Sequence, residues 1–222
     1  MVSHSAGVAV GGRGGDRIEE EIRLALPEPS GYAALREELT RRSQGAFFQD
    51  RSYRDFYLDH PDRLLLKSRL ALRWRAGVGG ARLEIKGEGV LQDGVWLRPE
   101  WCQEGCDVRP LRVDGIAAGP VRERLEALLG LDAPLEELCS CFVERHVMAL
   151  SSEGGMLEVS LDRGVIRAGG REVGICELEI EWCGVGGRQA GIELARVLRE
   201  RHGLTEAAHS KFRIGVGLLE GG

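Results

Sequence analysis

Three glutamates alternate with apolar residues in the segment 171–182, and their spacing gives the first indication of chemistry. They are Glu177, Glu179 and Glu181. Successive side chains of a β-strand point to opposite faces, so the three carboxylates share one face, while Leu178 and Ile180 share the other. Three like charges in a row repel one another. The face is therefore either solvated at the edge of a sheet, or it holds something positive between the carboxylates.

The same alternation recurs in other segments, where the charges are sorted by sign. The acidic pair is Glu19 with Glu21, and the basic pairs are Arg73 with Arg75 and Lys211 with Arg213. If a sheet with such faces closes on itself with the polar faces inward, one lumen holds both sets, and helices cover part of the apolar exterior. We therefore expect an α+β, mainly antiparallel β fold: a closed tunnel barrel with a polar lumen and helices packed outside.

A lumen that combines clustered bases with clustered acids suits one class of ligand. Arginine donates in a fork to phosphate oxygens, lysine supplies a point charge, and paired carboxylates bind hard cations such as Mg²⁺ or Mn²⁺. A polyphosphate with its bound metal satisfies both sets at once. The alternative is that the charges neutralise each other as buried ion pairs with no ligand role, although desolvating so many charges for structure alone is costly.

The rest of the chain supplies elements to carry these residues. Helices are predicted at 30–42, 120–129 and 188–202 from capping residues and apolar spacing. Alternation predicts strands at 18–26, 53–59, 70–75, 81–89, 142–150, 156–162, 171–182 and 209–216, with a turn at 153–155. Residues 90–113 are interpreted only as short strands or loops. The domain prediction is a flexible tail at 1–15, a single tunnel domain at 16–217 and a second tail at 218–222.

Composition limits the class of protein. The 222 residues include 30 Lys and Arg against 35 Asp and Glu, a formal net charge of -5, which argues against a general nucleic-acid binder. Since no apolar run approaches the roughly 20 residues of a membrane span and no signal peptide is evident, we expect a cytoplasmic protein without a membrane partner. The six cysteines are then expected to be reduced thiols. Apolar outer faces left bare by the helices would allow a homodimer.

The charged motifs occur in a characteristic order. The set is Glu19-x-Glu21-x-Arg23, Asp55 to Pro61, Leu72 to Arg75, Leu83 to Lys86, Phe142 to Arg145, Leu161-Asp162, Glu177-x-Glu179 and Ser210 to Arg213. In this order, over roughly Ile18 to Gly215, the chain resembles the CYTH superfamily, the triphosphate tunnel metalloenzymes. The resemblance implies a tunnel of eight antiparallel strands, open at both ends, that binds a triphosphate and a divalent metal. Members include inorganic, thiamine and RNA triphosphatases and class IV adenylyl cyclases.

The resemblance also implies residue roles. Triphosphate binding falls to Arg23, Arg73, Arg75, Lys86, Arg145 and Lys211, joined by Arg213 from the same motif as Lys211. The ligands of a bound Mg²⁺ or Mn²⁺ ion would be Glu19, Glu21, Asp162, Glu177 and Glu179. Lys86 and Tyr57 match the residues proposed to prepare the attacking water. We expect neighbouring arginines to lower the pKa of Lys86, so that some neutral amine exists near pH 7.

Departures from the family pattern narrow the function. Arg23 stands where lysine is usual, and Ser160 stands where a further carboxylate is often found, which bears on a second metal. Ala71 occupies the position where vertebrate thiamine triphosphatases carry a stacking Trp, which argues against a thiamine pocket. Among the members of the family, the chain resembles bacterial inorganic triphosphatases most in character. We therefore expect it to hydrolyse inorganic triphosphate. The alternatives are a class IV adenylyl cyclase and a polyphosphate- or nucleotide-binding module without turnover.

Overall fold

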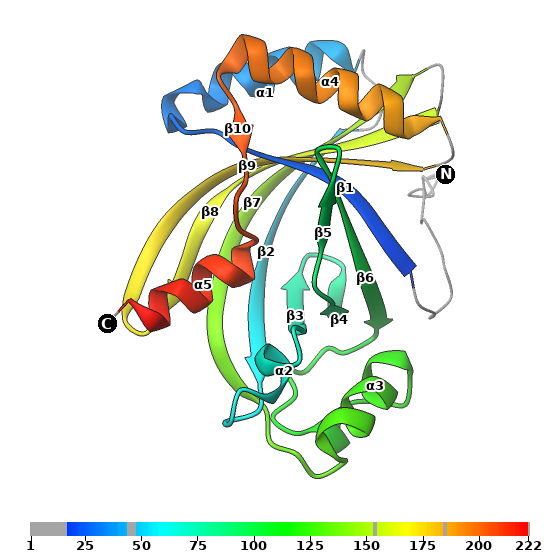
Figure 1. Cartoon of the computed structure of the whole chain (residues 1–222), viewed down its shortest axis with the longest axis vertical. Coiled ribbons are helices and arrows are strands. Elements are labelled where there is room, and N and C mark those ends of the chain that lie inside the picture. The colour runs from blue at the N-terminus through cyan, green and yellow to red at the C-terminus, as the bar shows by residue number, and fades with distance from the viewer. Residues whose placement is uncertain (1–16, 44–47, 153–154, 184–185, 222) are drawn as a thin grey trace, which may run out of the picture.

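The computed structural model describes residues 17–43, 48–152, 155–183 and 186–221. Within these residues ten strands form one antiparallel sheet, in the order β10-β1-β9-β8-β7-β2-β3-β4-β6-β5. Because β1 also pairs with β6, the eight strands from β1 to β6 in this order, both included, close into a barrel (Figure 1). The strands are β1 (Arg17–Ala25), β2 (Phe48–Asp59), β3 (Ala71–Gly77), β4 (Gly80–Lys86), β5 (Val90–Gln92), β6 (Val95–Glu104), β7 (Glu136–Ser152), β8 (Gly155–Ala168), β9 (Arg171–Cys183) and β10 (Thr205–Glu206).

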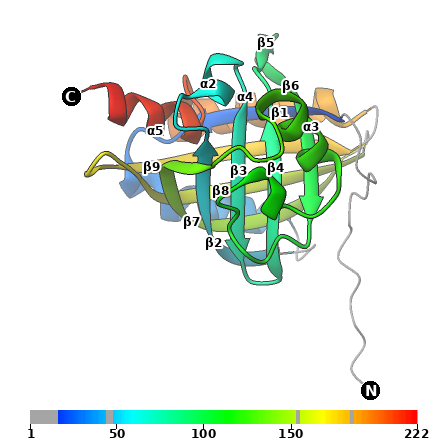
Figure 2. The same ribbon diagram turned by 90° about the horizontal axis from the view of Figure 1, so that it is seen from below.

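Helices lie outside the barrel. They are α1 (Tyr32–Arg42), α2 (Leu64–Lys67), α3 (Pro120–Leu129), α4 (Gly187–His202) and α5 (Lys211–Glu220), with single 3-10 turns at Pro29–Gly31 and Val113–Gly115. Figure 2 shows α2, α5 and the short strand β5 on the same side of the molecule. No helix in the described part of the chain has the length and apolarity needed to cross a membrane. The expected closed barrel with helices outside is confirmed.

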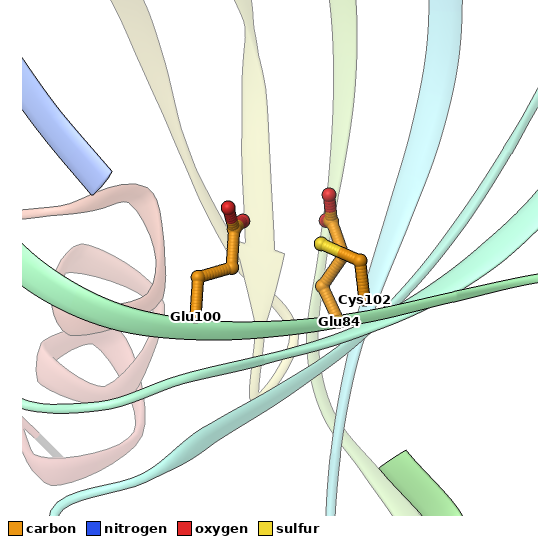
Figure 3. Close-up of side chains that lie close together, drawn as sticks. All are labelled: Glu84, Glu100 and Cys102. Carbon is orange, nitrogen blue, oxygen red and sulfur yellow. The ribbon is translucent and has the colours of Figure 1, made fainter. Parts of the chain in front are cut away.

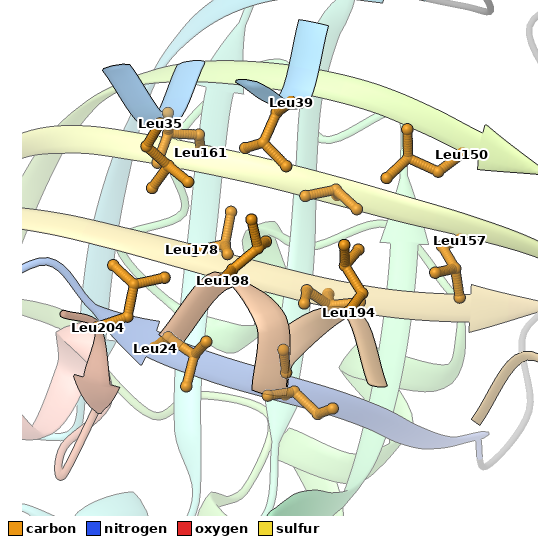
Figure 4. Close-up of a cluster of buried hydrophobic side chains, with 14 of the residues drawn as sticks. Leu24, Leu35, Leu39, Leu150, Leu157, Leu161, Leu178, Leu194, Leu198 and Leu204 are labelled. Carbon is orange, nitrogen blue, oxygen red and sulfur yellow. The ribbon is translucent and has the colours of Figure 1, made fainter. Parts of the chain in front are cut away.

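The largest apolar core lies between the outer face of the barrel and the pair α1 and α4 (Figure 4). Leu35 and Leu39 of α1 and Leu194 and Leu198 of α4 pack on apolar side chains of β1, β7, β8 and β9. These strand residues alternate with the charged ones, as the sequence pattern predicts. A second core joins α2 and α3 to β3, β4 and β6. The apolar faces of the strands thus point outward to the helices, and their polar faces are left to line the interior.

One predicted element was wrong. The segment 209–216 is not a strand; it lies at the start of α5, which continues to Glu220 through most of the predicted C-terminal tail. The Oγ of Ser210 caps the helix by accepting a hydrogen bond from the backbone N–H of Arg213 at 3.3 Å. Burial of Phe212, Gly215 and Val216 has the helical period, which the short alternation of four residues could not reveal.

Other differences between the predicted and the observed elements concern where the strands begin and end. Part of the 90–113 stretch forms the long strand β6, and β7 and β8 extend beyond their predicted limits. The predicted turn at 153–155 and the predicted tail at 1–15 fall wholly or largely outside the described residues.

A buried carboxylate joins α1 to α4. Glu38 accepts hydrogen bonds from Arg42 at 2.7 Å and Arg201 at 3.1 Å, and its other oxygen lies 2.8 Å from Nε2 of His202. Burial opposes ionisation, but the hydrogen bonds and charges of these partners lower the pKa of Glu38 from 4.5 to about 2. Because the folded pKa is the lower one, this stabilisation is full above about pH 5 and is lost as the pH falls towards 2.

We therefore expect Glu38→Gln to lower the free energy of unfolding by about 1–3 kcal/mol at pH 7, with a smaller loss at pH 3.5. Urea unfolding at both pH values measures the two losses. The matched control is Glu37→Gln, because Glu37 is 71% exposed and only pairs with Arg41 at 3.4 Å. An equal loss for Glu38→Gln at both pH values would contradict this account of the contact.

Candidate active site

Charged side chains fill the interior of the barrel. Asp55, Glu84 and Asp162 are each at most 1% exposed, and Arg73 is 8% exposed. Inward projection follows from the alternation of the strands. The antiparallel registers place Arg23 opposite Glu179, Arg73 opposite Glu84 and Arg145 opposite Asp162. Burying a charge is costly unless it is paired, so the partners of these residues determine what the lumen can bind.

The first group of charges lies on β2, β3 and β4. Asp55 receives two hydrogen bonds from Arg75, at 2.7 and 2.8 Å, and Nε of Arg73 donates to Glu84 at 2.6 Å. Arg75 also stacks on the ring of Tyr53, with Cζ 3.7 Å from the ring centroid. Burial acts against ionisation of Asp55, but Arg75 and Arg73 lower its pKa. The two arginines of the basic pair are thus held in fixed positions in the lumen.

The second group joins α5 to β7, β8 and β9. Nζ of Lys211 lies 2.7 Å from oxygens of Glu177 and Glu179 and 3.0 Å from Asp162. Arg145 donates two hydrogen bonds to Asp162, both at 2.7 Å, and pairs with Glu179. A lysine at the first position of a helix opposes the helix dipole. The three carboxylates offset this cost, which explains how α5 can begin with the Lys211 side chain directed into the lumen.

The third group surrounds Lys86 at the end of β4. Its Nζ lies 2.8 Å from Glu19 and 3.1 Å from Glu100, while Arg98 donates to Glu19 at 2.7 Å and to Glu21 at 2.8 Å. Burial disfavours the ammonium ion, but the carboxylates, chiefly Glu19 with Glu100, favour it, and on balance the pKa of Lys86 is raised. The expectation of a lowered pKa was wrong: Arg98 and Arg73 act in that direction, but the carboxylates nearest to Lys86 prevail. Lys86 is a cation here.

An excess of acid remains at Glu19, Glu21 and Glu181, whose oxygens lie within 4.8 Å of one another. Burial and the charges of Glu19, Glu21 and Glu179 raise the pKa of Glu181 to about 8, and burial with the charge of Glu19 raises that of Glu21. Burial is the largest cause of both increases, and the neighbouring carboxylates add to it. Lys86 and Arg98 instead lower the pKa of Glu19 to about 2, so the bases present balance the negative charge of the cluster only in part. Such an oxygen-only set fits a hard divalent cation.

A second cluster consists of Glu84 on β4 with Glu100 and Cys102 on β6 (Figure 3). Its ligand atoms also lie within 4.8 Å of one another, but Arg73 and Lys86 already neutralise the two carboxylates. Burial and the charge of Glu100 raise the pKa of the Cys102 thiol to about 12, so sulfur is protonated at neutral pH. This cluster is a poorer fit to a metal than the three glutamates.

The structure brings most, but not all, of the residues predicted from the sequence together in the lumen. Six of the seven predicted bases line the lumen, namely Arg23, Arg73, Arg75, Lys86, Arg145 and Lys211. Arg213 does not, because the helical turn of α5 directs it to the exposed outer face, so the prediction that it shares a face with Lys211 was wrong. The predicted metal ligands form two groups: Glu19 and Glu21 at one, and Asp162, Glu177 and Glu179 at Lys211. Tyr57 lies buried under α5, 5.3 Å from the ring of Phe212.

Residues that the prediction missed complete these groups. Arg98 and Glu100 lie in the stretch interpreted only as short strands or loops, and alternation within β6 was the available signal. Glu181 belongs to the acidic stretch, but only the register of β9 beside β1, which places it opposite Glu21, shows that it joins the first pair.

Known proteins share the architecture described above. The profile of the CYTH domain matches residues 17–214, almost the whole described chain. The chain belongs to the CYTH domain family. HpAC1 from Hippeastrum, a candidate adenylyl cyclase described as having a dominant triphosphatase activity, is similar with a TM-score of 0.71 at 21% identity, over 90% of this chain and 95% of that one.

Two further solved structures share the CYTH fold at lower similarity. PH1819 from Pyrococcus horikoshii has a TM-score of 0.54 at 20% identity, over 91% of this chain and 99% of that one. The capping enzyme triphosphatase of Mimivirus has a TM-score of 0.53 at 10% identity, over 83% of this chain and 89% of that one. At these identities the likeness shows the fold alone.

The position of Lys211 in this CYTH barrel depends on a close contact of α5. A Cβ on Gly215 would lie 2.3 Å from Sγ of Cys139 on β7, so only glycine lets the helix approach this far. We expect Gly215→Ala to lower the free energy of unfolding by about 1–3 kcal/mol, as overpacking does. Urea unfolding measures the change.

Gly217 provides the matched control in the same helix. A Cβ there would meet nothing within 4 Å, so Gly217→Ala should be neutral or stabilise by up to about 1 kcal/mol through helix propensity. Equal stabilities for the two alanine variants would show that the Gly215 contact does not limit the docking of α5.

Proposed function

We propose that the protein hydrolyses a triphosphate in the lumen of its barrel with a bound divalent metal, and that the substrate is inorganic triphosphate, cleaved to diphosphate and phosphate. The observation that carries the proposal is the convergence of six bases on one closed lumen beside an unbalanced acid cluster. The dominant triphosphatase activity of the similar Hippeastrum protein also supports it.

The ion pairs of the lumen indicate how a triphosphate would be held. Each carboxylate beside Arg73, Arg75, Arg145 or Lys211 presents oxygens at hydrogen-bonding distance to a cation, as phosphate oxygens would. A triphosphate carries several such oxygens on one chain. It would replace part of the carboxylate contacts and align the phosphates along the bases, which fixes the terminal phosphorus for in-line attack.

The displaced acids are then available to a metal. Glu19, Glu21 and Glu181 would hold it, and Asp162, Glu177 and Glu179 would contribute once Lys211 turns to phosphate. Mg²⁺ or Mn²⁺ bound to such acids neutralises phosphate charge and makes a bound water more acidic.

Lys86 and Tyr57 are the proposed catalytic pair. As a cation Lys86 would bind phosphate oxygens and orient the attacking water as a hydrogen-bond donor, because Glu19 and Glu100 keep it protonated. Burial raises the pKa of Tyr57, so its hydroxyl keeps its proton and would serve as a hydrogen-bond donor to the substrate or the attacking water.

The absence of a large organic group on the substrate is supported by the surroundings of Ala71. This residue is partly buried against the apolar cluster of Tyr57, Leu138 and Phe212 under α5. A pocket for a thiamine or a nucleoside would need that space, whereas inorganic triphosphate needs only the charged lumen.

The activity test is phosphate release from inorganic triphosphate, ATP and thiamine triphosphate, each with Mg²⁺, Mn²⁺ or EDTA. We expect metal-dependent release from inorganic triphosphate, well above the other two. Release from none of them would contradict the proposal. Formation of cyclic AMP from ATP in that case would identify a cyclase, and its absence a binding module.

A pair of neighbouring substitutions on α5 tests the lumen assignment. Lys211→Ala removes a buried cation and should reduce turnover of inorganic triphosphate by about 100-fold or more, as loss of a transition-state contact does. Arg213→Ala should leave turnover within about twofold, because its side chain is exposed on the outer face of the helix. Equal effects of the two substitutions would contradict the assignment.

A further inference from the structure

One lumen cation is held differently from the others. Arg23 on β1 is 6% exposed, and its nearest ion-pair contact is Nε to Oε1 of Glu21 at 3.4 Å. The other five predicted lumen bases have partners at 2.6–2.8 Å. The Nε of Arg23 is also buried and has no hydrogen-bond partner within the described part of the chain. A buried guanidinium with this little carboxylate contact keeps donors available to an anion.

An aromatic ring takes the place of the missing carboxylate. Cζ of Arg23 lies 4.8 Å from the centroid of the Trp96 ring, within the range of a cation–π interaction. Trp96 is the residue of β6 opposite Glu21, two residues before Arg98 on the same face. Gly89 supports the ring, since a Cβ there would lie only 3.0 Å from Cε3 of Trp96.

The two types of partner have different consequences for a ligand. A carboxylate that orients an arginine also cancels its charge, so an incoming phosphate must compete with it. An indole orients the guanidinium through its face and leaves the charge uncancelled. The planar guanidinium suits this arrangement better than the ammonium ion of the lysine usual at this position of the family motif.

We propose that Trp96 is a positioning residue that holds Arg23 over its ring as a lumen cation without a close carboxylate, available to a phosphate of the substrate. The inference rests on the proposed function in taking the lumen as the triphosphate site. It predicts that Trp96 contributes to triphosphate affinity through Arg23 and through no other residue.

The test is a double-mutant cycle of Trp96→Ala and Arg23→Ala, read as the dissociation constant of inorganic triphosphate in EDTA by titration calorimetry. Trp96→Ala should weaken binding roughly tenfold in the wild-type background and by less than about twofold when Arg23 is already alanine. Trp96→Phe keeps an aromatic face and should stay within about threefold of wild type. With Mg²⁺ present, Trp96→Ala should raise KM and change kcat little.

Each contrary result has a distinct meaning. Equal weakening by Trp96→Ala in both backgrounds, or none in either, overturns the inference; the fitted stoichiometry separates weak binding from partial unfolding. Wild-type protein that binds triphosphate but releases no phosphate contradicts the proposed function alone, and the cycle still decides the role of Trp96. Wild-type protein that does not bind triphosphate overturns both.

Discussion

The pairing of buried charges inside a closed barrel is the constraint on which the rest of the structure depends. The lumen takes bases and acids from all eight barrel strands and from α5, and almost every base has a carboxylate at hydrogen-bonding distance. Closure through β1 and β6 is what brings Glu19 to Lys86, 67 residues away in the chain. Because an unpaired buried charge is so unfavourable, the registers of the strands are fixed by their inner faces as well as by the outer core.

The pairing is also incomplete in a way that relates to function. Where β1 meets β9 the acids outnumber the bases, and Glu181 has a pKa near neutrality. Near the same strands Arg23 has an aromatic partner in place of a close carboxylate. A local excess of carboxylates favours binding of a cation, and a base whose charge is not neutralised by a carboxylate favours binding of an anion. A triphosphate carrying a divalent metal would supply both, in keeping with the proposed function.

Much of this could be predicted from sequence, for a physical reason. A strand with one charged and one apolar face shows a two-residue period in its sequence. The sequence alone therefore predicts the shared faces of three pairs: Glu19 with Glu21, Arg73 with Arg75, and Glu177 with Glu179. Other features depend on contacts between distant segments. The raised pKa of Lys86 comes from Glu19 and Glu100, and the latter lies in a stretch whose pattern was too mixed to interpret. The last segment alternates for only four residues, a pattern that is compatible with a strand and with a helix. In the structure it begins a helix, which packs closely on β7 at Gly215.

The central claim is that one lumen holds both the triphosphate and its metal. The most direct measurement is a crystal structure of the protein with inorganic triphosphate and Mn²⁺, with the metal located by its anomalous scattering. The account predicts a triphosphate within the barrel in contact with Arg73, Arg75 and Lys211, and an anomalous peak beside Glu19, Glu21 and Glu181. A triphosphate bound only outside the barrel, or a lumen with its ion pairs unchanged and no anomalous peak, would contradict it.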